Sequence, residues 1–506
     1  MISAPGVARD GTRLFRDQHN DAQWCRWYQG RARKMRGYRE QVRNIDGPGR
    51  TLDVFANDTY SYVHVGTGNA FQRYAIQNGT GSNTGVVSRT PAGYVPSDQN
   101  IWQTDQMYDV AGTTTNIFAA ATPSAQALTS SAALPVYYGD IVSPDPLLVI
   151  PSATTSGGLC VTGPYLFLYG HDGVVQWSVP GNPLDFTGAG SGDARPVASK
   201  IVKGMALRGS SGPSVILWSL DSVIIGQWVG GADVFDFTTV TKNSSILSSS
   251  GVVEHNGIYY WPTSSGFSMF NGVMRDLPND MNRHWFLDNL NMPYRQRVFG
   301  FKIPRWDEIW WCFPFGNATE NTHAVVYNYK ENTWYDTMLP DAGRSAGYYE
   351  TIFSSPIMCS PLVNTDTGGT SAWQHEFGLD EISGALAIPR AIPSWFETNE
   401  FNSIEVGQMG AMGVDQALSF NLMEPDFDQR GDLYFSTITR ANARAKLTPS
   451  DTILVPAVPT AGTQLVKFRR MGRLTAFRIE SNEVGGDYTV GCPLIHVQPG
   501  DQRRED

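Results

Sequence analysis

Three stretches between Ser214 and Thr337 repeat one pattern of strand-forming residues. They read SVILWSLDSVIIGQWVGGADVFDF, NGIYYWPTSSGFSMFNGVMRDLP and WDEIWWCFPFGNATENTHAVVYNYKENTWYDT. In each stretch an apolar run rises into a Trp or Tyr cluster, passes a Gly, Asn or Ser turn and returns as a second apolar run. An aromatic hairpin that recurs at long intervals predicts a series of small sheets, one after another. The pattern therefore indicates a scaffold built from β-hairpins.

The hairpins recur along most of the chain, at intervals of about 40–60 residues. Such a period, with several strands in each unit, is typical of a β-propeller. Two packed sandwiches would give similar spacing, but the likeness between the hairpins favours the propeller. We therefore predict an all-β fold: a β-propeller of about six blades with an additional antiparallel, β-sandwich-like platform module. The aromatic markers of the six units are Tyr60, Tyr165, Trp218, Tyr259, Trp310 and Trp373.

Changes in residue composition and pattern divide the chain into four parts. Residues 1–22 are expected to form a flexible arm, and residues 23–50 a strand pair for which a place in the platform is left open. Residues 51–390 are expected to form the propeller. Within them, residues 80–157 are rich in Ser, Thr, Ala and Gly, which predicts an insertion or an irregular blade. Prolines near residue 390 mark a junction, so residues 391–506 are expected to form the platform or docking module.

Alternating residues in the segment KFRRMGRLTAFRIES predict that this platform has one solvated face. Apolar and basic side chains are expected on opposite faces of its strands, which suits docking against a neighbour. The apolar set is Phe468, Leu474 and Phe477, and the basic set is Arg469, Arg473 and Arg478.

Charge and cysteine usage limit the class of protein. The net charge of −10 argues against a sequence-reading nucleic-acid binder, which normally carries a basic face, but suits a protein that lets nucleic acid pass. Five scattered cysteines without a CxxC pair support neither a zinc ribbon nor a disulfide framework, and indicate a reduced compartment. The N-terminus lacks the apolar core of a signal peptide, and no apolar run reaches membrane-spanning length. Assembly inside a cell is the resulting expectation.

Basic residues crowd between positions 26 and 43 despite the acidic total. Contact with nucleic acid or an acidic partner would explain them, and so would an edge strand protected by charge. The charged edge strand or a protein contact is favoured over DNA. The basic residues are Arg26, Arg31, Arg33, Lys34, Arg36, Arg39 and Arg43.

Two sequence features could belong to a glycan-degrading enzyme. Asp172-Gly173 before Trp177 resembles one imperfect copy of the Asp-box turn of sialidases, but a hairpin turn before a packed Trp explains it better. Paired carboxylates for glycoside hydrolysis would need two acids facing one cleft. Solvated turns are the favoured interpretation of the candidate acids, which are Asp307, Glu308, Glu424, Asp426 and Asp428.

No other catalytic or metal-binding pattern is present in the sequence. The eight histidines never fall into HxH or HExxH spacing, and no GxSxG nucleophile elbow or phosphate-cradling glycine loop occurs. We therefore expect no catalytic, cofactor-binding or metal-binding residues, no cofactor and no enzymatic activity.

Several phrases of the chain, in their order, resemble the tail nozzle proteins (tubular or hub proteins) of short-tailed bacteriophages. The likeness covers about residues 23–498 and is weakest at 80–157. The phrases are YQGRARKMRGYRE, WSLDSVIIGQWVGGADVFDFTTVTKNSSILSSSGVVEHNGIYYW, GFSMFNG, DEIWWCFP, VVYNYKENTWYDT, MEPDFDQRGDLYF and RRMGRLTAFRIESNEVGG.

This resemblance implies a structural virion protein that retains packaged double-stranded DNA and conducts it during ejection. Members form a homohexameric ring below the portal and adaptor rings, and the distal end meets a fibre, needle, plug or ejected protein. DNA would pass through the lumen without sequence-specific binding. The implied location is the short tail of the virion, assembled in the host cytoplasm, with the host membrane met only indirectly.

The alternative is a propeller that binds or degrades glycans. A glycan-binding face would need exposed aromatic residues, whereas we expect Trp310, Trp311 and Trp334 to lie in the core. The sequence does not indicate the host, the channel-lining residues, the gate, or whether residues 80–157 form a gate loop, a rim loop or a blade.

Overall fold

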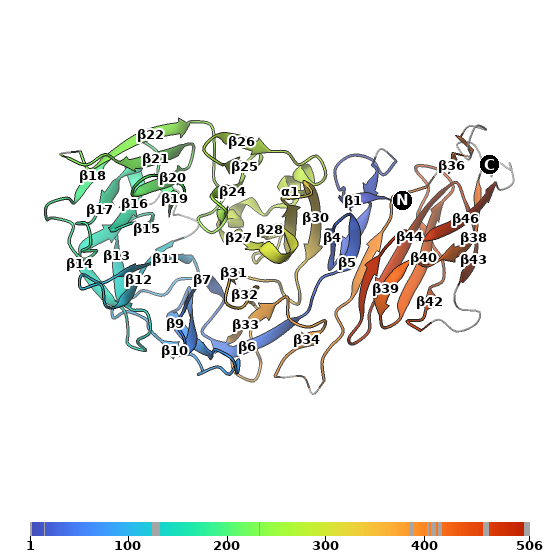
Figure 1. Ribbon diagram of the computed structural model, residues 1–506, viewed down its shortest axis with the longest axis horizontal. Helices are drawn as coiled ribbons and strands as arrows, with labels where there is room; N and C mark the ends of the chain where they lie inside the picture. The colour runs from blue at the N-terminus through green and yellow to red at the C-terminus, as the bar shows by residue number, and fades with distance from the viewer. Residues whose placement is uncertain are drawn as a thin grey trace.

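The computed structural model describes residues 3–14, 16–123, 132–231, 233–384, 386, 388–401, 404–405, 411–412, 417–458 and 465–499. Nearly all regular structure in them is β-strand. The exceptions are helix α1 (Arg283–Asn289) and the 3-10 turns η1 (His171–Gly173), η2 (Met292–Arg297) and η3 (Pro304–Trp306). None of the described helices is long and apolar enough to cross a bilayer. The strands form a ring of sheets with a second β unit at one side (Figure 1).

The first three sheets of the ring are four-stranded antiparallel meanders that follow one another along the chain. The first contains β7 (Gly49–Ala56), β8 (Tyr60–Thr67), β9 (Phe71–Gln77) and β10 (Val87–Ser88). The second contains β11 (Asn100–Tyr108), β12 (Thr115–Pro123), β13 (Leu134–Asp140) and β14 (Leu148–Thr155). The third contains β15 (Gly158–Thr162), β16 (Tyr165–Tyr169), β17 (Val175–Trp177) and β18 (Gly192–Ala194).

The next three sheets have the same order. The fourth contains β19 (Ile201–Ala206), β20 (Ser214–Ser219), β21 (Val223–Trp228) and β22 (Phe235–Thr241). The fifth contains β23 (Val253–His255), β24 (Ile258–Thr263), β25 (Gly266–Phe270) and β26 (Met274–Leu277). The sixth contains β27 (Phe299–Ile303), β28 (Glu308–Phe313), β29 (His323–Asn328) and β30 (Thr333–Met338).

A seventh sheet closes the ring with a strand from the N-terminal region. It contains β31 (Ala346–Glu350), β32 (Ser355–Cys359), β33 (Thr370–His375), β6 (Tyr38–Ile45) and β34 (Glu381–Ile382). β6 pairs antiparallel with β33 and leads directly into β7 of the first blade. Backbone hydrogen bonds hold β6 in the last blade, and the chain itself then joins β6 to the first blade. The fold is a β-propeller, as predicted, and it has seven blades where the sequence predicted about six.

The additional blade lies in the segment that was expected to be an insertion. Residues 100–155 form β11–β14, the second blade, and β10 completes the first, while residues 124–131 lie outside the described residues. The middle of this blade is built on Phe118 and the buried alanines Ala119, Ala120 and Ala121. Small side chains allow close packing here. The aromatic pattern used to locate blades was therefore weak in this segment.

Aromatic side chains pack between neighbouring blades. Trp218 of the fourth blade meets Trp261 of the fifth, with ring centroids 5.5 Å apart. Phe267 of the fifth blade meets Trp311 of the sixth at 4.9 Å. Such offset and edge contacts add to the gain from burial. Trp310, Trp311 and Trp334 are all buried, which confirms the prediction that they belong to the core.

The second unit is a β-sandwich-like platform of three sheets. One sheet contains β3 (Asp21–Gln23), β35 (Ser394–Glu397), β44 (Leu474–Ser481), β40 (Leu433–Arg440), β41 (Thr448–Pro449) and β42 (Ile453–Val455). Another contains β43 (Val466–Gly472), β38 (Leu418–Glu424) and β46 (Leu494–Pro499), and a third contains β39 (Phe427–Arg430), β45 (Asp487–Val490), β5 (Arg31–Lys34) and β4 (Cys25–Tyr28). β36 (Ile404–Glu405) pairs with β37 (Ala411–Met412). Phe468, Leu474 and Phe477 are buried, as predicted.

The N-terminal region is shared between the two units. Residues 23–50 were expected to form one strand pair. Instead β4 and β5 belong to the platform, whereas β6 belongs to the propeller. Residues 1–22 were expected to be a flexible arm, but β1 (Ala4–Val7) pairs in parallel with β2 (Gln18–His19) and contacts β30 of the sixth blade. Its paired strands carry the buried residues Val7 and His19, whereas Leu14, in the loop between the two strands, is exposed.

Closure by β6 predicts a large cost for weakening that strand. Ile45 is fully buried between the first and last blades, so Ile45→Ala should lower the free energy of unfolding by about 2–5 kcal/mol. The neighbouring side chain of Asn44 is exposed, and Asn44→Ala should change stability by less than about 0.5 kcal/mol. Urea unfolding followed by tryptophan fluorescence measures both. Equal effects of the two variants would contradict the closing role of β6.

Candidate functional site

The candidate acids from the sequence do not come together. Glu308 begins β28 in the sixth blade, while Glu424 ends β38 and Asp428 lies in β39, both in the platform. Glu424 accepts a hydrogen bond from His496 at 2.6 Å when that ring nitrogen carries the proton, and Asp426 is exposed and accepts from the backbone N–H of Cys492. These acids form no pair across one cleft.

Asp307 and Glu308 have different surroundings although they are neighbours. Asp307 ends turn η3 with a left-handed backbone (φ 59°), where its carboxylate pairs with the Lys330 amine at 2.9 Å. It lies in a strand-entry turn, as interpreted from the sequence, but it is buried, so the expectation that it is solvated is wrong. Glu308 was placed in the same solvated turn, and that interpretation is wrong because its side chain is fully buried.

Glu308 belongs to a buried ion cluster between the propeller and the platform. The guanidinium of Arg26, on β4, lies 2.9 Å from Glu308 and 2.6 Å from Glu376. The indole N–H groups of Trp310 and Trp306 donate to Glu308 and Glu376 at 2.8 and 2.7 Å respectively. Two carboxylates therefore share one cation in a space closed to water. We call Arg26, Glu308 and Glu376 the junction cluster.

The two carboxylates of the junction cluster respond differently to burial. Burial raises the pKa of Glu308 to about 6, although Arg26 acts in the opposite direction. Burial also acts to raise the pKa of Glu376, but attraction and hydrogen bonds from Arg26 outweigh it and lower that pKa. One positive charge cannot fully compensate two negative charges, so the extra proton is most easily taken up by Glu308.

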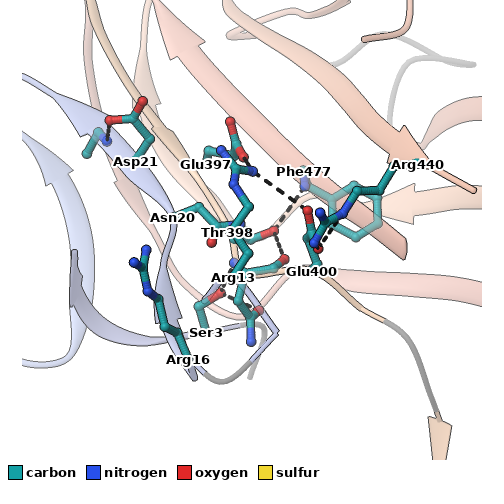
Figure 2. Close-up of polar contacts among 12 residues, drawn as sticks. Ser3, Arg13, Arg16, Asn20, Asp21, Glu397, Thr398, Glu400, Arg440 and Phe477 are labelled. Carbon is teal, nitrogen blue, oxygen red and sulfur yellow. Dashed lines mark hydrogen bonds and ion pairs between the residues drawn. The ribbon is translucent and has the colours of Figure 1, made fainter. Parts of the chain in front are cut away.

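An N-terminal clasp, residues 3–20, holds the outer side of the same joint (Figure 2). Its platform end is a set of polar contacts on the segment after β35. The Arg13 guanidinium pairs with Glu397 at 2.8 Å, and the buried Glu400 lies between Arg13 and Arg440. The Ser3 hydroxyl donates to the Asn399 side chain, and the Asn20 amide donates to the Thr398 carbonyl at 2.9 Å.

The propeller end of the clasp contacts the sixth blade and helix α1. Arg9 pairs with Asp336 of β30 at 2.7 Å and with Asp21 at 2.5 Å. The Asp10 carboxylate accepts from the backbone N–H groups of His284 and Trp285, both at 2.8 Å. A residue distant in sequence thus satisfies the first N–H groups of α1, which otherwise lack partners.

Most of the basic residues at 26–43 contact other residues of the same chain. Arg33 lies over the Trp306 ring, and Arg39 lies over the Phe377 ring. Arg43 pairs with Glu40 and Asp366, while Lys34 is buried. The edge-strand explanation fits only in part: β4 is the edge of its sheet, but Arg26 points into the joint. Arg31 remains exposed.

The remaining sequence candidates are structural. Asp172 and Gly173 form turn η1 between β16 and β17 with positive φ angles, and Trp177 packs against Phe235, which confirms the hairpin-turn interpretation. Among the described residues no group of three or more His, Cys, Asp or Glu is placed to hold a metal ion. The buried cysteines are Cys25, Cys160, Cys312 and Cys359, and Cys492 is exposed.

A cavity of about 450 Å³ lies on the axis of the propeller, among the inner strands of the blades. That volume lies within the range of about 300–1,000 Å³ that is usual for small-molecule sites. A DNA duplex, whose major groove alone is about 12 Å wide, does not fit through it. The cavity has the size of a small-molecule site, and sequence reasoning gave no signal for it.

The junction cluster predicts that two arginines of one hairpin differ strongly in their contribution to the free energy of unfolding. Arg26→Met leaves two buried carboxylates without their cation and should cost about 3–5 kcal/mol in the free energy of unfolding. Arg31→Met removes an exposed charge from the same hairpin and should change stability by less than about 0.5 kcal/mol. Chemical denaturation of both variants tests this, and a small effect of Arg26→Met would show that the cluster does not stabilise the joint.

The raised pKa of Glu308 also predicts that the stability of the protein depends on pH. Its pKa in the folded protein, about 6, exceeds the ordinary value of 4.5, so its protonation favours the folded state. This stabilisation is complete below about pH 4.5 and is lost as the pH rises through 6. Relative to Glu308→Gln, which cannot titrate, the wild-type protein should lose about 2 kcal/mol between pH 4.5 and 7. Unfolding of both proteins across this range measures the difference, and a constant difference would contradict the assignment.

Comparisons with known proteins add little to these observations. No family model matches the chain, and no curated protein matches it. Among solved structures, the WD40 domain of coronin from Toxoplasma gondii aligns with a TM-score of 0.34 and 9% identity, over 70% of this chain and 88% of that domain. So low a score carries no argument, and the propeller is defined here by its seven sheets and their closure.

Proposed function

We propose that this protein is a structural virion component, the tail nozzle of a short-tailed phage. In this proposal it forms a ring that retains packaged double-stranded DNA and conducts it during ejection. Support comes from the sequence resemblance, whose phrases fall on the fourth to sixth blades, on β4–β5 and on the platform strands. The same segments build both units and the joint between them.

The observation that carries the proposal is the continuous core across the joint. Trp310 and Tyr335 of the sixth blade, Trp27 of β4 and Phe396 and Phe435 of the platform belong to one buried apolar cluster. Large apolar interfaces between units oppose relative motion. A wall that retains DNA under load needs such stiffness, which an independently moving binding domain would not.

The narrow axial cavity gives the proposal a specific geometry. Because a duplex cannot pass through one propeller, the conduit would run between subunits of the ring. Ring closure requires contacts between different faces of each subunit. The net charge of −10 suits such a lumen, since a wall rich in Lys and Arg would hold DNA by counterion release.

The proposed partners follow from the same arrangement. The platform would dock to the portal or adaptor ring above, and the distal blades would meet a fibre, needle or plug protein. Assembly would take place in the host cytoplasm, and the mature location would be the virion tail. Trp310, Trp311 and Trp334 are buried, so these three aromatic residues cannot form the exposed face that the glycan-binding alternative needs.

The proposal predicts a closed ring of defined mass. Six copies of the 55.6 kDa chain give a particle of about 330 kDa, with a central opening wider than a duplex. Mass photometry and negative-stain imaging of the purified protein, alone and with its adaptor ring, measure mass and symmetry. Sixfold rings with the adaptor would support the proposal. Monomers alone, at micromolar concentration and with the adaptor present, would contradict it.

A further inference from the structure

The axial cavity of the propeller carries charged side chains that the proposed function does not use. Its volume of about 450 Å³ lies within the usual range of about 300–1,000 Å³ for small-molecule sites. The inner strands of all seven blades contribute to the lining. A cavity of this size, lined by polar groups from every blade, can surround a small ligand.

The carboxylates of the cavity wall already have donors. Asp105 accepts from the backbone N–H groups of Val161 and Gln106, both at 2.8 Å. Glu254 accepts from the Gly257 N–H at 2.8 Å, and the Lys302 amine lies 3.7 Å away. Asp53 accepts from the Gln106 side-chain amide at 2.9 Å. These acids are therefore held in place by the protein itself.

Two cations of the same wall have no such partner. Lys203, on β19, lines the cavity. Arg208, just after the end of β19, also lines the cavity and is exposed to solvent. Within the described part of the chain, neither the Lys203 amine nor the Arg208 guanidinium makes a hydrogen bond or an ion pair. Arg50, by contrast, lines the cavity and is paired with Glu320 at 2.7 Å.

A partly dehydrated ammonium without a partner is costly, because the protein replaces only some of its water contacts. Burial lowers the pKa of Lys203, although Asp105, Cys160 and Asp53 act in the opposite direction. A bound oxyanion would supply the missing acceptors to Lys203 and Arg208 together. Charge-assisted hydrogen bonds of this kind are among the strongest in proteins.

We propose that the axial cavity binds a small anionic ligand whose phosphate or carboxylate group is held by Lys203 and Arg208. The site is independent of the nozzle proposal, since it lies within one subunit. Its ligand would be a metabolite-sized anion, because the cavity excludes a duplex. Because the ligand would bind the folded propeller only, binding would stabilise it.

Titration calorimetry of the full chain with inorganic phosphate, and separately with succinate, tests the site at constant ionic strength set with chloride. We expect at least one of these anions to bind once per chain. Lys203→Met should weaken that binding about tenfold or more. Lys242→Met is the matched control, because Lys242 is an exposed lysine just after β22 of the same blade and should leave the affinity unchanged.

A second measurement in the wild-type protein does not depend on a variant that folds. Lysine acetylation by limiting acetic anhydride, read by peptide mass spectrometry, should be slowed at Lys203 by the bound anion and unchanged at Lys242. If neither anion binds, the proposal is overturned. So would unaltered affinity in Lys203→Met, or equal labelling of Lys203 with and without the anion.

Discussion

The joint between the propeller and the platform depends on one arginine that faces two carboxylates. Arg26 reaches Glu308 and Glu376 from β4 at a nearly dry contact, where two indole N–H groups and the Tyr335 hydroxyl also donate to these carboxylates. A buried cluster of this kind adds little net stability over an apolar core of equal volume. Its effect is positional, because any rotation of the platform would separate charges that have no water to replace them. The angle between the two units is thereby fixed.

The path of the N-terminal region makes the two units interdependent. The chain forms the clasp, contributes β3–β5 to the platform, and only then supplies β6 to the last blade before beginning the first. Ring closure, platform completion and the junction cluster therefore use residues from the first tenth of the sequence. Contacts between such distant segments form late and slowly during folding. The propeller and the platform share one buried core, which suits the proposed role as the wall of a ring.

Sequence patterns located most of the fold because aromatic hairpins mark the blades that pack through large side chains. They failed at the second blade, where Ala119–Ala121 pack closely and the aromatic residues Trp102, Phe118 and Tyr137 are spread singly over three strands. They failed again at Glu308, since an Asp-Glu pair after a turn looks solvated unless its partner is known. That partner, Arg26, is 282 positions away, and only the folded chain brings the two together. Lys203 and Arg208 had no local signal, because what they share is that neither forms an ion pair with any residue that the structure describes.

Many basic residues of the N-terminal region form ion pairs within the subunit, which lowers the positive charge left for its outer surface. Arg9, Arg13, Arg26 and Arg43 each pair with at least two carboxylates, so much of the positive charge in the N-terminal region is compensated inside one subunit. The basic stretch that first suggested contact with nucleic acid is thus mainly part of the joint. The carboxylates of these ion pairs outnumber the arginines, so the pairs add no positive charge to the surface of a chain whose net charge is −10. Few phosphates could be neutralised by such a surface, so DNA beside it would keep its counterions and remain free to slide. In the proposed ring, the ion pairs that stiffen the wall would therefore also keep it from binding the DNA tightly.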